Sequence, residues 1–170
     1  PKVGSSYVIG SAVDEGTGKV TNGLGTDATV TETATEVKEF GKEWTLEKAE
    51  ITGVKNAFYL KSAEGYLGLT DATTDGSIEL TDAKKDACAF VYDVNTKQFK
   101  LAKEYDVTNA PVNAILVTVD ATQALEVVAT VSGGTNTALG AVAVFSAPLE
   151  YDENKLLASI GGDYHFIGKE

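Results

Sequence analysis

The sequence contains no arginine and no methionine, and it has one cysteine and one histidine among its 170 residues. All 14 basic residues are lysine, against 25 Asp and Glu, so the net charge is −11. Arginine is the side chain best suited to form paired hydrogen bonds with phosphate groups and guanine edges. An acidic chain also repels polyanions such as nucleic acid. These absences argue against nucleic acid and anionic membrane surfaces as partners, and the charge favours solubility.

A single cysteine excludes an intrachain disulfide, and the apolar segment ACAFVY around Cys88 predicts a small buried core residue. One Cys and one His cannot supply the ligands of a zinc site. Asp71 and Asp75, like Asp14 and Glu15, offer oxygen ligands from loops, but their spacing does not match a calcium-binding loop. The sequence therefore predicts neither a metal nor a cofactor.

Catalytic motifs are also missing. A Ser-His-Asp triad would need His165, the one histidine of the sequence, which lies in an expected strand. There is no G-x-S-x-G nucleophile elbow, and the segment GTGKVTNG lacks the spacing of a phosphate-binding loop. We predict that the protein is not an enzyme.

Long apolar runs are absent as well. None approaches the roughly 20 residues of a membrane-spanning helix, so membrane insertion is not expected. The chain begins at Pro1 and lacks methionine, which predicts a processed chain or a domain of a longer parent. The acidic composition, rich in Thr, Ala and Gly, is typical of bacterial secreted or cell-surface proteins, and we expect that location.

What the sequence does contain is a series of short segments in which apolar and polar residues alternate. In the stretch 57–101 this alternation predicts strands at 57–62, 65–70, 77–81 and 87–94, separated by Gly-rich or polar turns. The polar segment 82–87 is expected to form one turn of 3₁₀ helix. These four strands form one structural unit.

Two further units can be aligned with this one. Their expected strands are, in chain order, 6–12, 19–25, 27–36 and 43–49, then 98–101, 114–119, 123–130 and 141–148. Each unit opens and closes on an aromatic residue: Tyr7 and Trp44, Phe58 and Phe90, Phe99 and Phe145. The repeat is about 40 to 55 residues, and three units are few for a β-propeller.

The order of an aromatic strand, a Gly-Tyr-Leu return, an alternating strand and a closing aromatic resembles the β-trefoil domains of ricin-type lectins. The resemblance implies an all-β fold, a β-trefoil of three four-strand units in a domain over 1–150; an antiparallel β-sandwich is the alternative. Ricin-type repeats usually carry Gln-x-Trp near the fourth strand. This chain has Lys42-Glu43-Trp44, Cys88-Ala89-Phe90 and Ala143-Val144-Phe145 there.

Residues 155–168, KLLASIGGDYHFIG, repeat the hairpin pattern after the twelfth expected strand. We expect a C-terminal hairpin within 151–170. It is an extra hairpin, a strand of the first unit supplied late, or the start of a further module.

The resemblance implies a non-catalytic binding module that recognises glycan. A pyranose needs an aromatic face and polar groups that fix its hydroxyls. Tyr66 and Asp71 hold positions where related lectins place part of their pocket, and with Asp75 of the same loop they are the predicted ligand-binding residues. The closing aromatics Trp44, Phe90 and Phe145 are expected to meet in the core, near the shared axis of the three units. The alternatives are a structural or adhesive module of a cell-surface assembly, with a surface protein as partner, and a protease inhibitor, because Kunitz-type legume inhibitors share this fold and size.

Overall fold

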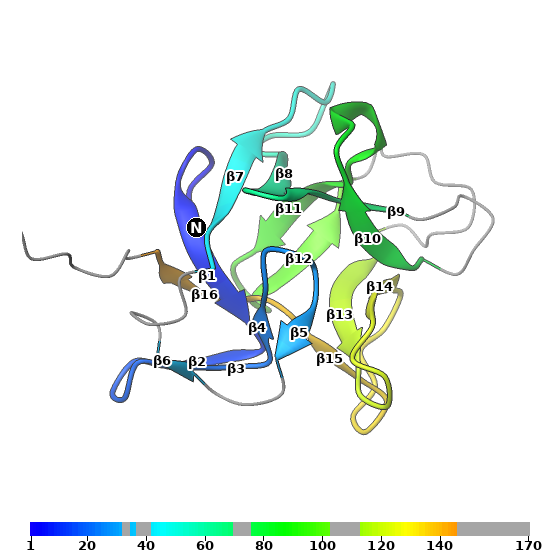
Figure 1. Cartoon of the computed structure of the whole chain (residues 1–170). Coiled ribbons are helices and arrows are strands. Elements are labelled where there is room, and N and C mark those ends of the chain that lie inside the picture. Colours follow the sequence, from blue (N-terminus) through cyan, green and yellow to red (C-terminus); the bar gives the residue numbers. More distant parts are fainter. Residues whose placement is uncertain (32–34, 37–41, 70–75, 103–112, 146–170) are drawn as a thin grey trace, which may run out of the picture.

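The computed structural model describes residues 1–31, 35–36, 42–69, 76–102 and 113–145, and in these residues the protein is all-β (Figure 1). Beside strands and turns they contain one 3₁₀ turn, η1 (Lys84–Asp86), which confirms the turn expected in 82–87. The strands are β1 (Ser6–Gly10), β2 (Ala12–Asp14), β3 (Lys19–Thr21), β4 (Gly23–Leu24), β5 (Val30–Thr31), β6 (Thr35–Glu36), β7 (Trp44–Lys48), β8 (Phe58–Ser62), β9 (Gly65–Leu69), β10 (Ile78–Thr81), β11 (Ala89–Asp93), β12 (Gln98–Leu101), β13 (Ile115–Val119), β14 (Leu125–Val128), β15 (Asn136–Ala138) and β16 (Ala141–Val144).

All strand pairs are antiparallel, as expected for strands joined by short turns. The main sheet runs in the order β14-β13-β12-β11-β8-β7-β1-β16, with β9 attached to β8, β10 to β9 and β15 to β13. Two small sheets, β2-β3-β6 and β4-β5, complete the described strands. Figure 1 shows β2–β3, β9–β10 and β13–β15 projecting to different sides of the central strands.

The core forms because alternate residues of the central strands face one side. Trp44 and Leu46 of β7 and Leu60 of β8 are fully buried, whereas the residues between them are half-buried or exposed. The ring of Phe99 makes edge-to-face contacts with Phe58, Phe90 and Tyr92. Each fully buried large side chain contributes about 1.5–3 kcal/mol through the hydrophobic effect. The predictions of Trp44 and Cys88 as core residues are confirmed.

The expectation that Phe145 joins Trp44 and Phe90 in the core is wrong. Phe145 packs against Val8 and Val20 in a separate small cluster. The cause is the register of β16 on β1. Val142 opposes Ile9 on the side of the main core, whereas Ala143 opposes Val8 on the other side. Phe145 lies two residues after Ala143, so it points to the side of Val8 and away from the main core.

The first unit has more turns than its sequence predicts. The strand expected over 19–25 is broken at Asn22, whose φ is 48°. The strand expected over 27–36 begins instead with a turn, because the Asp27 carboxylate accepts hydrogen bonds from the backbone N–H of Thr29 at 3.2 Å and from its hydroxyl at 2.7 Å. These bonds hold the Asp27 carboxyl pKa below its usual range. Side-chain capping of this kind competes with strand pairing.

The third unit has one strand more than predicted. Between the strands expected at 123–130 and 141–148, the sequence SGGTNT of 132–137 predicts a turn, but β15 begins within it and pairs with β13. The turn is shorter than expected because the side-chain oxygen of Asn136 accepts a hydrogen bond from the backbone N–H of Ser132 at 2.8 Å.

Several predictions lie outside the described residues. They are the C-terminal hairpin of 151–170 with His165, and the loop residues Asp71 and Asp75. Nowhere in the described part of the chain is there a helix with the length and hydrophobicity needed to cross a bilayer.

Candidate functional site

The most polar convergence of side chains lies on the outer face of β7 and β8. Trp44 and Leu46 point into the core. Because the side chains of a strand alternate between its two faces, Thr45 and Glu47 point outward. In the register of the two strands Glu47 opposes Tyr59, and Thr45 opposes Lys61. Directly opposed residues place their side chains on the same face, within reach of each other.

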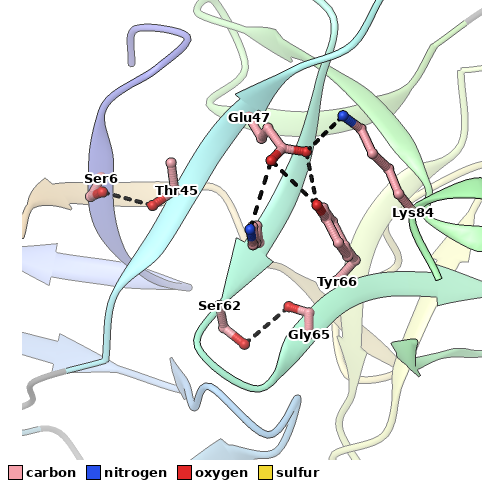
Figure 2. Close-up of polar contacts among 8 residues, drawn as sticks. Ser6, Thr45, Glu47, Ser62, Gly65, Tyr66 and Lys84 are labelled. Carbon is pink, nitrogen blue, oxygen red and sulfur yellow. Dashed lines mark hydrogen bonds and ion pairs between the residues drawn. The ribbon is translucent and has the colours of Figure 1, made fainter. Parts of the chain in front are cut away.

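Three different elements supply partners to the Glu47 carboxylate (Figure 2). The hydroxyl of Tyr66, on β9, donates to Oε2 at 3.0 Å and to Oε1 at 3.3 Å. The ammonium of Lys84, from η1, lies 3.3 Å from Oε2, and that of Lys61, on β8, lies 3.9 Å from Oε1. Both lysines are about half exposed, so solvent reaches this carboxylate and its partners.

The same lysines cover two tyrosine rings. Lys61 Nζ lies 5.5 Å from the centroid of the Tyr66 ring, and Lys84 Nζ lies 5.6 Å from that of Tyr59. The two rings meet edge to face at 6.0 Å. The hydrogen bond to Glu47 and its charge raise the pKa of Lys84 above its ordinary value. We call Glu47, Tyr59, Lys61, Tyr66 and Lys84 the Glu47 cluster.

A shallow hollow of about 290 Å³ opens beside the Glu47 cluster, lined by Glu43, Thr45, Glu47, Lys61, Ser62 and Ala63. Two of its hydroxyls already have partners in the protein. Thr45 shares a hydrogen bond of 2.8 Å with Ser6, and Ser62 contacts the carbonyl oxygens of Thr26 and Gly65 at 2.7 and 3.1 Å. The ionic groups of the hollow are therefore its main means of holding a polar ligand.

A second lysine–carboxylate pair lies on β11 and β12. Lys100 Nζ donates to Asp93 Oδ2 at 2.9 Å, and the other carboxylate oxygen accepts the backbone N–H groups of Asn95 and Thr96 at 2.9 and 3.3 Å. First the Lys100 bond and then these two backbone bonds lower the Asp93 pKa to about 2. This carboxylate fixes the hairpin turn between the two strands.

Of the three predicted ligand-binding residues, only Tyr66 is among the described ones. Its side chain is buried, with 9% of the residue exposed, and its hydroxyl is bound to Glu47. Glu47, Lys61 and Lys84 are not among the predicted ligand-binding residues. Nothing in their local sequence marks them, because only the strand register and η1 bring them together.

The described residues contain no group of three or more His, Cys, Asp and Glu side chains arranged to hold a metal ion. Asp14, which was weighed as a calcium ligand, instead accepts the backbone N–H groups of Gly16 and Thr17 at 2.9 and 3.2 Å. Neither the protein-family models nor the curated proteins compared with this sequence match it.

Proposed function

We propose that the protein is a non-catalytic glycan-binding module that holds a sugar in the hollow beside the Glu47 cluster. The observation that carries the proposal is the convergence of two ammonium groups and a phenol, from three separate elements, on one solvent-accessible carboxylate. A sugar hydroxyl both donates and accepts hydrogen bonds. It can therefore donate to Glu47 and accept from Lys61 or Lys84.

The fold that we propose for this module is a β-trefoil. In the main sheet β12-β11-β8-β7-β1-β16 are consecutive neighbours, and they are the first and last strands of the three repeated units. Among the described strands the run is open, because β12 and β16 do not pair, but its ends lie near each other: the hydroxyl of Tyr92, on β11 beside β12, donates to the carbonyl of Gly140, just before β16, at 2.6 Å. A Cβ at Gly140 would collide with the carbonyl oxygen of Lys97, so the backbones are in contact there.

The hollow suits a small hydroxyl-rich ligand better than an apolar one. Its walls carry carboxylates and an ammonium, and the adjacent tyrosine rings are each covered by a lysine. Hydrogen bonds to charged groups are the stronger ones, at about 1.5–3 kcal/mol each. Two such bonds are enough for the weak, specific affinity of a monosaccharide site.

A glycan array, followed by isothermal titration with the best ligand, tests this proposal. We expect the protein to bind at least one glycan, and Glu47→Gln to weaken that binding by about tenfold or more through loss of a charged acceptor. Glu50→Gln is the matched control, because Glu50 is a fully solvated carboxylate just beyond the same strand, paired with Lys48. Absence of binding to every glycan, or equal effects of the two substitutions, would contradict the proposal.

A second candidate function is adhesion through a strand edge. Among the described strands β16 pairs only with β1, and its Val144 is one of two large apolar side chains that are mostly exposed. An unpaired edge with an apolar side chain is a template for another strand. If this function operates, Val144→Lys will abolish concentration-dependent self-association in analytical ultracentrifugation. A wild-type protein that stays monomeric up to millimolar concentration excludes self-adhesion.

A further inference from the structure

A second concavity, distinct from the hollow beside Glu47, lies where three chain segments meet. It has a volume of about 350 Å³ and is bordered by residues 1–3, by the connection between β7 and β8, and by the end of β11. This volume is at the lower end of the range of small-molecule sites. We call it the Lys2–Lys55 pocket.

The lining of the Lys2–Lys55 pocket is mixed: polar groups, among them Asn56, lie beside several apolar side chains. Phe58 and Tyr92 belong to the main core or pack against it, Val91 packs against a second cluster of buried alanines, and Val94 adds an apolar side chain to the lining. Val94 is 69% exposed, although valine is usually buried. Burial raises the pKa of the Tyr92 phenol, so the wall remains uncharged near neutral pH. An apolar ligand would remove this surface from water.

The rim of the pocket is basic in an otherwise acidic protein. The chain has 25 acidic and 14 basic residues, yet the described residues that line the pocket include Lys2 and Lys55 and neither Asp nor Glu. Asp93, which lies in sequence between the lining residues Tyr92 and Val94, is already paired with Lys100 and accepts backbone N–H groups of its own turn. The two ammonium groups therefore have no competing carboxylate in the lining.

Both rim lysines lie on ordered backbone. The N–H of Lys2 donates to the Tyr7 hydroxyl at 2.7 Å, and its carbonyl accepts the N–H of Ser5 at 3.1 Å. Lys55 follows a tight turn closed by the N–H of Val54 on the Ile51 carbonyl at 3.1 Å. A rim fixed before binding lowers the entropy that a ligand must overcome.

We propose that the Lys2–Lys55 pocket binds a small organic carboxylate with an apolar body. The carboxylate is held by the ammonium groups of Lys2 and Lys55, and the apolar body lies against Phe58, Val91 and Val94. The pairing follows from charge complementarity, because only an anionic ligand gains from both lysines. This site is independent of sugar binding beside Glu47.

The test is a titration of the ¹⁵N-labelled full chain with 4-phenylbutyrate, followed by amide chemical shifts. The neutral 4-phenyl-1-butanol, which has the same apolar body, is titrated in parallel. We expect saturable shifts at Phe58, Val91 and Val94, and about tenfold weaker binding of the alcohol. No shifts in this region, or equal affinity for acid and alcohol, would overturn the proposal.

The variant Lys2→Gln/Lys55→Gln separates charge from shape, since both residues are exposed and their replacement leaves the core intact. Its affinity for phenylbutyrate should fall about tenfold, to that of the alcohol, with an otherwise unchanged amide spectrum. The matched control Lys19→Gln/Lys85→Gln removes the same charge from exposed positions outside the pocket and should bind phenylbutyrate as the wild type does. Equal losses in both variants would mean that only the net charge matters and would refute the site. Glu47→Gln should leave this binding unchanged.

Discussion

Glu47 on β7 and Asp93 on β11 are carboxylates on two hairpins, and they are shielded from solvent to the same degree. Their side chains are 29% and 27% exposed, and each is paired with lysine. What differs is the type of donor. Asp93 receives two backbone N–H groups of its own turn, whereas the donors that the described residues give Glu47 are side chains.

This difference decides which carboxylate can exchange partners. Lys100 is 25% exposed, and the backbone donors of Asp93 cannot move without opening the turn. Lys61 and Lys84 are 48% and 57% exposed, and exposed ion pairs are held weakly. A ligand hydroxyl can displace an ammonium group from Glu47 at low cost. This difference supports the proposed binding at Glu47 and gives Asp93 a role in the stability of its hairpin.

The largest expected effect concerns the core beneath both hairpins. Trp44 lies on the core side of β7 and Phe99 on that of β12, and both are fully buried. Trp44→Ala and Phe99→Ala should each lower the free energy of unfolding by about 3–5 kcal/mol, through lost burial and a cavity. Urea denaturation measures this. A much smaller loss at one position would mean that the two hairpins do not share one core.

The acid dependence of stability should follow Asp93. Its folded pKa of about 2 lies below the ordinary 3.8, so the unfolded chain takes up a proton first as the pH falls. The stabilisation is therefore complete above about pH 4 and is lost as the pH falls to about 2. In urea titrations the stability difference between wild type and Asp93→Asn should shrink over this interval. A difference that is constant with pH would show that Lys100 and the turn do not stabilise the charged form.

A smaller effect should appear at Lys84. Glu47 raises the Lys84 pKa through a hydrogen bond and through its charge. In Glu47→Gln both causes weaken, so the Lys84 pKa should return toward 10.5, while Asp93→Asn should leave it unchanged. An NMR titration of the lysine side chains measures both variants. If the Lys84 pKa stays raised in Glu47→Gln, Glu47 is not the cause of the raised pKa, and the ion pair between Lys84 and Glu47 does not form in solution.

The smallest effect is expected at Tyr92. Burial is the main cause of its raised pKa, and the charge of Asp93 adds to it. Asp93→Asn should therefore lower the Tyr92 pKa only in part, and Glu47→Gln should not change it. A tyrosine ¹³Cζ titration resolves the two variants. Full reversion in Asp93→Asn would mean that Tyr92 is more exposed than its contact with Phe99 indicates.

The sequence predicts the local elements well where a strand alternates and a glycine turn follows. The strands expected at 57–62, 65–70 and 77–81 correspond to β8, β9 and β10 within about one residue at each end. Gly65, with φ of 147°, supplies the turn between the first two. These features depend on neighbouring residues, so a single sequence is enough to find them.

The candidate site and the position of Phe145 depend on register between strands, which the local sequence does not specify. Glu47 and Lys84 are separated by 37 positions in the sequence. They meet because β7, β8 and β9 are successive neighbours in the sheet and η1 lies against β9. Because strand side chains alternate, a register of β16 on β1 that differed by one residue would exchange the two faces of β16. The observed register places Phe145 on the face away from the main core.

The most direct test of the comparison is one calorimetric titration series with the best glycan ligand, on wild type, Glu47→Gln and Asp93→Asn. The account predicts that Glu47→Gln binds about tenfold or more weakly, while Asp93→Asn binds as the wild type does at neutral pH. Equal loss in both variants, or loss only in Asp93→Asn, would contradict the assignment of binding to Glu47.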